Sequence, residues 1–197
     1  MAAIYSFEAR NGWIMIALAI GVVMAAMLVG ACDETDPAAA KVIPVKVAGK
    51  KFYLEVAADD QVRMKGLGSR THIEDDGGMI FSFTPGQTRV QTFVMRDCLT
   101  PIDIIYLDGA GRVLSTHTMP TEPPRAADGS EGKVGEFGTA SGTAPADKYE
   151  ARLTKTYSSR FPSPFVIEVQ EGTIKKLGVK EGDLISFDVS GLKRRTK

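Results

Sequence analysis

Five residues between positions 70 and 103 carry side chains that could bind a ligand or take part in a reaction. They are Arg70, Arg96, Asp97, Cys98 and Asp103. Four of them lie in a short stretch, residues 96–103, which we call the polar segment. It interrupts an apolar region, and a sheet with only a structural role rarely needs so many charged groups there. We therefore treat these residues as the candidate site.

The two arginines could recognise an anion. A guanidinium group presents fixed, forked donors that match a carboxylate or a phosphate, and two of them together would favour an anionic ligand. Arg70 and Arg96 are the candidates, and Tyr106 could lie at the rim of such a pocket. The alternative is that both arginines form salt bridges with acidic neighbours.

The two aspartates could form a carboxylate pair for acid–base chemistry or for a hard metal ion. Asp97 and Asp103 are six residues apart with Pro101 between them, so the spacing does not require them to face each other. In the alternative, Asp103 accepts backbone N–H groups at the turn near Pro101, and Asp97 pairs with Arg96 or Arg70.

Cys98 could act as a nucleophile only with a base to take its proton or lower its pKa. The chain has two histidines, His72 and His117, and the sequence places neither of them near Cys98. The alternative is a small, half-buried residue at the end of a strand. No cluster of histidines and cysteines indicates zinc, and no glycine-rich phosphate loop or serine elbow is present. We predict no metal and no cofactor.

The N-terminal region predicts export. Residues 13–31 are uncharged and long enough to cross a bilayer as a helix. They end in Val29-Gly30-Ala31-Cys32, which resembles a bacterial lipobox with Cys32 as the lipidated residue. The alternative is an uncleaved signal anchor. Both predict a domain on the periplasmic side of the cytoplasmic membrane, because Arg10 precedes the apolar stretch and acidic residues follow it.

The rest of the chain predicts one β-rich domain. Residues 1–32 form the signal peptide or anchor, 33–41 a tether, 42–190 the domain, and 191–197 a basic tail. Apolar residues alternate with other residues at every second position, and turn residues separate these stretches. This pattern predicts strands at 42–47, 51–56, 79–83, 89–95, 103–107, 112–117, 165–169 and 184–189. Short helices are expected after Asp59 and at 173–177. About eight strands and two helices predict a compact barrel or rolled sheet.

Residues of about 120–160 differ in composition from the rest of the domain. They are rich in Pro, Gly, Ala, Ser and Thr and contain few large apolar residues. A segment of that length without regular structure is either functional or poorly ordered. We predict a largely flexible insertion with one or two helical turns near 146–153.

Several segments resemble the bacterial and archaeal family called domain of unknown function 192. The matching segments are Gly66-Leu67 with Arg70, 78–83, 93–104, 108–111, 168–172 and 177–183. The chain departs from the family at Gly68, where Met is usual. It also departs at Val94, Arg96, Asp97 and Cys98, where Trp, Lys, Asn and Thr are usual. The resemblance implies an uncharacterised, exported or membrane-anchored domain and a divergent member.

The zero net charge argues against a nucleic-acid-binding protein. We therefore expect a membrane-tethered envelope domain that binds a small, possibly anionic ligand or a partner protein without catalysis. The first alternative is a hydrolase or transferase that uses Asp97 and Asp103, or Cys98. The second is a scaffolding envelope protein in which the polar segment only stabilises the fold.

Overall fold

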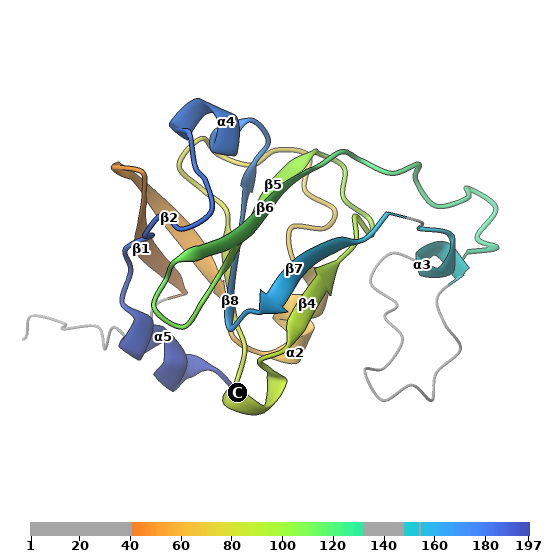
Figure 1. Cartoon of the computed structure of the whole chain (residues 1–197). Coiled ribbons are helices and arrows are strands. Elements are labelled where there is room, and N and C mark those ends of the chain that lie inside the picture. The colour runs from red at the N-terminus through yellow and green to blue at the C-terminus, as the bar shows by residue number, and fades with distance from the viewer. Residues whose placement is uncertain (1–40, 132–147, 154) are drawn as a thin grey trace, which may run out of the picture. The chain divides into compact units, whose positions relative to one another are not determined.

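In the computed structural model, the described residues are 41–131, 148–153 and 155–197. Their strands form a six-stranded sheet and a separate two-stranded sheet (Figure 1). The strands are β1 (Val42–Val47), β2 (Lys50–Ala57), β3 (Met79–Ser82), β4 (Val90–Phe93), β5 (Ile102–Leu107), β6 (Val113–Met119), β7 (Tyr157–Pro162) and β8 (Phe165–Gln170). The short helices are α2 (Asp60–Lys65), α3 (Lys148–Arg152), α4 (Thr173–Leu177) and α5 (Val189–Arg195), with a 3-10 turn at Pro85–Gln87.

The larger sheet has the strand order β1-β2-β3-β8-β5-β6, and β4 pairs with β7 in the smaller one. Strands β2 and β3 are parallel, and the other neighbours in the larger sheet are antiparallel. The larger sheet has two ends, at β1 and β6, so it is a rolled sheet and not a closed barrel. This confirms the predicted mainly β fold in its open form.

The first hairpin follows directly from local sequence. Strand β1 alternates exposed and buried residues along its whole length, as a half-buried strand does. Ala48 and Gly49 connect it to β2 with φ angles of 44° and 88°. Positive φ at both central residues is the signature of the tight turn that matches the twist of paired strands, and Gly adopts it without strain.

The central strands β3, β5 and β8 are buried on both faces. Ile80, Ile105 and Ile167 face one hydrophobic cluster, which also includes residues of β1 and β2. Phe81 and Tyr106 face a second cluster on the opposite side. Because successive residues of a strand point to opposite faces, the residue after Ile167 also points toward the second cluster. That residue is Glu168.

One expected strand was wrong. Residues 184–189 do not form a strand, because Leu184 and Ser186 make only isolated bridges to Arg112 and Lys46. The Asp188 side chain then accepts a hydrogen bond from the Gly191 N–H and caps α5. The number of strands still matches the expectation, since β7 supplies one that the sequence did not predict.

The segments expected to lack sheet structure also contain regular elements. Strand β7 begins at Tyr157, inside the expected insertion, and α3 lies where helical turns were expected. Residues 132–147 of that insertion are outside the described residues. The basic residues expected as a tail belong largely to α5. The Lys197 N–H then donates a hydrogen bond to the Ala58 carbonyl, so this end of the chain packs on the domain.

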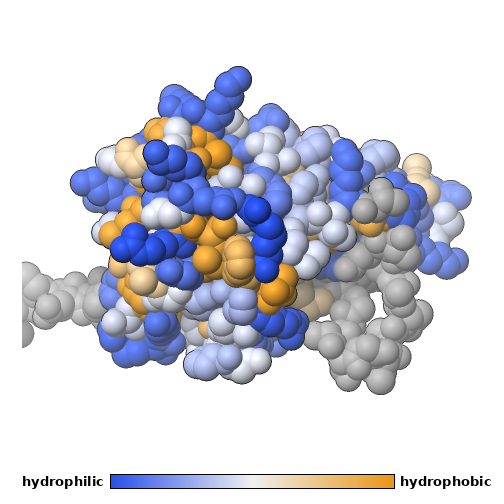
Figure 2. All heavy atoms as spheres, viewed as in Figure 1, coloured by the Kyte–Doolittle hydropathy of each residue, from blue (hydrophilic) through white to orange (hydrophobic). Residues whose placement is uncertain are grey.

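The surface carries scattered apolar side chains. Figure 2 shows hydrophobic residues between hydrophilic ones on the face turned to the viewer. The large exposed ones are Val42, Tyr53, Val90, Leu99, Phe161 and Leu184. Among the described residues, no helix is both long and apolar enough to span a membrane. The apolar stretch 13–31 and Cys32 lie outside the described residues.

Candidate functional site

The structure does not gather Arg70, Arg96, Asp97 and Asp103 into one pocket. The Arg70 guanidinium forms a two-point ion pair with Glu55, Nη1 to Oε1 at 2.6 Å and Nη2 to Oε2 at 2.8 Å. This pair lowers the pKa of Glu55 and raises that of Arg70. Arg70 is therefore held in a half-exposed salt bridge.

Asp97 is engaged by an arginine that the sequence did not single out. Arg125 donates to both carboxylate oxygens of Asp97, Nε to Oδ1 at 2.7 Å and Nη2 to Oδ2 at 2.9 Å. The side chains are 8% and 9% exposed, so this ion pair is buried. The Arg125 guanidinium also lies 4.5 Å from the centre of the Tyr149 ring. Asp97 thus anchors residues 120–131, which we call the strap.

Asp103 is fully buried in β5 and accepts two hydrogen bonds. Thr118 Oγ1 of β6 donates to Oδ1 at 2.7 Å, and the Ile174 N–H at the start of α4 donates to Oδ2 at 2.8 Å. Asp103 does accept a backbone N–H, but from α4 and not from the turn near Pro101. Its carboxylate joins three elements of the fold.

Arg96 and Cys98 line a cavity of about 290 Å³ that the sequence did not predict. Arg96 Nη2 donates to the Met64 carbonyl at the end of α2, at 2.8 Å. The Cys98 thiol donates to the Arg96 carbonyl, with the sulfur 3.5 Å from the oxygen. Burial, together with the nearby Glu168 and Asp97 carboxyls, raises the pKa of the thiol to about 12. Cys98 is therefore a thiol at neutral pH and not an activated nucleophile.

The walls of the cavity are mainly apolar. They come from α2, the loop that follows it, β3 and β4, with apolar side chains contributed by Leu67, Phe81, Phe83, Phe93 and Val94. Phe81 and Phe93 meet edge to face, with ring centres 5.2 Å apart and an interplanar angle of 88°. Aromatic walls of this kind favour flat, apolar parts of a ligand.

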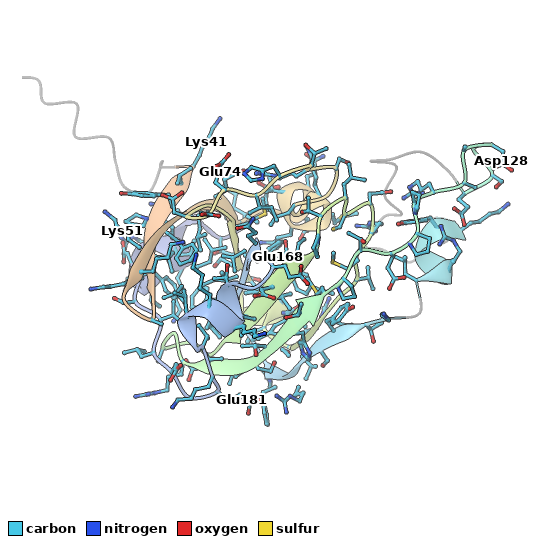
Figure 3. The ribbon with its side chains drawn as sticks, turned by 90° about the horizontal axis from the view of Figure 1, so that it is seen from above. Lys41, Lys51, Glu74, Asp128, Glu168 and Glu181 are labelled. Atoms are coloured by element: carbon cyan, nitrogen blue, oxygen red, sulfur yellow. The ribbon has the colours of Figure 1, made fainter. Side chains whose placement is uncertain are left out.

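Glu168 is the polar residue inside these walls. It lies in the middle of β8, opposite Met79 of β3 and Ile104 of β5, and its exposure is 5%. The Leu67 backbone N–H donates a hydrogen bond to its carboxyl, while Oε2 has no partner among the described residues. In Figure 3, Glu168 lies well inside the outline, whereas labelled residues such as Lys51, Asp128 and Glu181 lie toward its edge.

Burial controls the charge of Glu168. Desolvation raises the pKa of this carboxyl to about 8, although the Leu67 hydrogen bond and the charge of Arg70 act in the opposite direction. The raised pKa keeps the group mostly protonated at neutral pH. Titratable groups with raised pKa values in cavities are candidates for functional sites.

A glycine allows the backbone of β8 to pass this close to its neighbour. At Gly78, an added Cβ would lie 2.3 Å from the carbonyl oxygen of Glu168, and its φ angle is 141°. Any side chain would clash with this backbone oxygen. Gly78 therefore helps to set the position of Glu168 against β3.

Basic residues predominate among the charged groups that line the cavity. They are Arg63, Lys65, Arg89 and Arg96, of which Lys65 and Arg89 are exposed, and the carboxyl groups besides Glu168 number one, Asp60. Asp60 already pairs with Arg63 at 2.7 Å, and that arginine lowers its pKa. The mouth of the cavity thus carries an excess of positive charge. Within the part of the chain that the structure describes, no three His, Cys, Asp or Glu side chains are grouped as metal ligands.

The segments that carry the family resemblance meet at this cavity. Four separate stretches of sequence contribute to its lining: Gly66-Leu67, Phe81 and Phe83, then Phe93, Val94, Arg96 and Cys98, and finally Glu168. The model of the domain of unknown function 192 family, described as an uncharacterized ACR, matches residues 43–187. The chain belongs to this family.

Two solved structures are similar to this chain, and the first of them shows its fold in another protein. A protein from Sinorhizobium meliloti 1021, described as a candidate transcription regulator, is 24% identical with a TM-score of 0.52; the match covers 75% of this chain and 92% of that one. A protein of unknown function from Novosphingobium aromaticivorans DSM 12444 is 22% identical with a TM-score of 0.49, covering 74% and 83%. No curated protein matches the chain in sequence.

Sequence reasoning missed Glu168 and Arg125 as the important charged residues. A signal for Glu168 is present, because it is the one charged residue in the strand Phe165–Gln170, which is otherwise apolar up to its last residue. Glutamate is rarely buried without a partner. Arg125 has no comparable signal, since it lies in a Pro- and Ala-rich segment far along the chain from Asp97.

Proposed function

We propose that this member of the domain of unknown function 192 family binds a small ligand in the Glu168 cavity without catalysing a reaction. One observation carries the proposal: a buried carboxyl oxygen without a partner lines a cavity with apolar walls. An unsatisfied buried polar atom costs free energy, and a ligand that supplies its hydrogen bond would remove that cost. The cavity volume is near the lower end of the range for small-molecule sites, about 300–1,000 Å³.

The groups named for the alternative enzyme are not placed for a reaction. Asp97 and Asp103 are held by Arg125, Thr118 and the Ile174 backbone, and the Cys98 thiol has a raised pKa. The scaffold alternative accounts for both aspartates, since each of them stabilises the fold. It does not account for Glu168, for which an apolar residue would be the stabilising choice.

A binding screen with a blocked cavity tests the proposal. The purified full chain is screened against a chemically diverse set of small molecules by thermal shift, and hits are confirmed by mass spectrometry. The blocking variant is Val94→Trp, because Val94 is a half-buried lining residue and Trp would occupy part of the space. Val90→Trp is the matched control, since Val90 belongs to the neighbouring strand β4, is 45% exposed and does not line the cavity.

We expect hits that bind the wild-type chain and Val90→Trp but not Val94→Trp. Hits that bind all three proteins equally would place binding elsewhere and contradict the proposal. If a partner protein is the natural occupant, the screen gives no hits and Val94→Trp abolishes capture of that protein.

We further propose that the domain is tethered on the periplasmic side of the cytoplasmic membrane. The support is the apolar stretch 13–31 that ends in the lipobox-like Val29-Gly30-Ala31-Cys32. Blocking lipoprotein processing with globomycin should increase the mass of the cell-associated protein. An unchanged mass would rule out lipidation of Cys32 and favour an uncleaved N-terminal anchor.

A further inference from the structure

The charge at the mouth of the Glu168 cavity restricts the class of ligand. Lys65 and Arg89 line the cavity and are exposed, so they lie at its solvent side. Among the described residues, the structure shows no ion pair for either of these two side chains. The guanidinium group of Arg89 and the ammonium group of Lys65 attract carboxylates and phosphates, and they repel protonated amines.

The inner end of the cavity sets a second requirement. Glu168 Oε2 is buried without a partner, beside the apolar walls. A ligand amine would need an ionised carboxylate there, and burial disfavours that ionised form. A hydroxyl group can both donate and accept a hydrogen bond, so it pairs with the carboxyl in either protonation state.

The walls set the third requirement. Phe81 is fully buried, and Phe83 and Phe93 are half-buried on the same cavity. Rings prefer offset or edge-to-face neighbours, and such contacts add about 0.5–1.5 kcal/mol beyond the area that they bury. The small volume leaves room for a single-ring molecule.

The geometry points to a small aromatic acid with a hydroxyl group at the end opposite its anionic group. The hydroxyl group forms a hydrogen bond with Glu168 Oε2, and the ring lies against Phe81 and Phe93. The anionic group lies near Arg89 and Lys65. This inference rests on the proposed function, because it names the class of ligand for the same cavity.

Four probes of the same size and shape test each requirement separately. They are 4-hydroxyphenylacetate, phenylacetate without the hydroxyl, tyrosol without the anionic group, and tyramine with a cation in its place. Binding to the full chain is measured by isothermal titration calorimetry at neutral pH. We expect 4-hydroxyphenylacetate to bind at least tenfold more tightly than tyramine, with phenylacetate and tyrosol between them.

Two variants assign the contacts. Arg89→Gln should reduce the preference for 4-hydroxyphenylacetate over tyrosol severalfold while leaving tyrosol binding unchanged. Glu168→Leu should remove the preference for 4-hydroxyphenylacetate over phenylacetate. Arg112→Gln is a matched control for the loss of an exposed arginine, because Arg112 does not line the cavity.

The outcomes separate this inference from the proposed function. If tyramine binds as well as the acids, or if none of the four probes binds at 10 mM, the ligand class is wrong. The proposed function would survive either result if the broad screen still gives ligands that Val94→Trp excludes. If 4-hydroxyphenylacetate binds Val94→Trp as tightly as it binds the wild-type chain, it binds outside the cavity and the ligand class is wrong. The proposed function itself fails if Val94→Trp excludes none of the hits of the broad screen.

Discussion

The polar segment and the Glu168 cavity both contain buried carboxyl groups, but these groups differ in how many of their oxygens have hydrogen-bond partners. In the polar segment, each aspartate has partners for both of its oxygens, from Arg125 or from Thr118 and Ile174. In the cavity, Glu168 has one hydrogen bond and an oxygen without a partner. Satisfied carboxylates stabilise a fold, whereas an unsatisfied one costs stability. The difference teaches that the two aspartates of the polar segment have partners within the fold, whereas Glu168, the one buried glutamate among the described residues, keeps an oxygen without a partner in the candidate site.

The largest expected effect comes from leaving Asp97 without its partner. Arg125→Met should lower the free energy of unfolding by about 4 kcal/mol, because a buried carboxylate then stays uncompensated. Urea denaturation at pH 7 measures this effect.

Two controls sharpen that measurement. Asp97→Asn combined with Arg125→Met should restore much of the loss, since Asn tolerates the φ angle of 54° at this position. Arg152→Met removes the other arginine that lies over the Tyr149 ring, at 4.7 Å, but from a more exposed ion pair. We expect its cost to be below about 1 kcal/mol. Equal costs for the two arginines would contradict a special role for the Asp97 pair.

Glu168 should make stability depend on pH. Its pKa is about 8 in the folded chain against an ordinary value of 4.5, so the folded state holds the proton more strongly. The stability is then highest below pH 4.5 and falls as the pH rises toward 8, by about 3 kcal/mol between pH 5 and pH 8.

Denaturation midpoints of the wild-type chain and Glu168→Gln, measured from pH 5 to pH 9, check this expectation. The variant should lose the decline and be the more stable protein at pH 8. A wild-type stability that rises with pH through this range would show that Glu168 is ionised and that its oxygens have partners.

Removing the Asp103 carboxylate should have a smaller effect. Asp103→Ala leaves the Thr118 hydroxyl and the Ile174 N–H without an acceptor, and we expect a loss of about 2 kcal/mol. Asp103→Asn keeps one acceptor oxygen and should lose less. Amide hydrogen exchange at Ile174 reports whether α4 detaches, and unchanged protection in the alanine variant would refute the proposed anchoring of α4.

The smallest effect is expected at the Arg70–Glu55 pair. Its side chains are 37% and 43% exposed, and exposed pairs contribute about 0–1 kcal/mol. A double-mutant cycle with Arg70→Met and Glu55→Gln should give a coupling energy below about 1 kcal/mol. A much larger coupling energy would show that this pair stabilises the fold as strongly as the buried Asp97–Arg125 pair.

Local pattern was enough to predict much of the frame. Strand β1 and helix α4 have the residue ranges expected from the sequence, and the remaining expected strands are shifted by a few residues except at 184–189. The missed β7 has a physical cause. Tyr157–Pro162 contains few apolar residues, and its pairing with β4 depends on a partner more than sixty residues away.

The sequence by itself determined the family, the alternating faces of the strands and the tight hairpin, because each depends on neighbouring residues. It also identified the polar segment as unusual. Only the tertiary structure decided which charged side chains are in contact. Asp97 pairs with Arg125, twenty-eight residues later in the chain, and four distant stretches of sequence line the cavity that contains Glu168. These contacts depend on the path of the chain through the rolled sheet. Whether a buried carboxyl has a partner is therefore a property of the packed molecule, and no local pattern reports it.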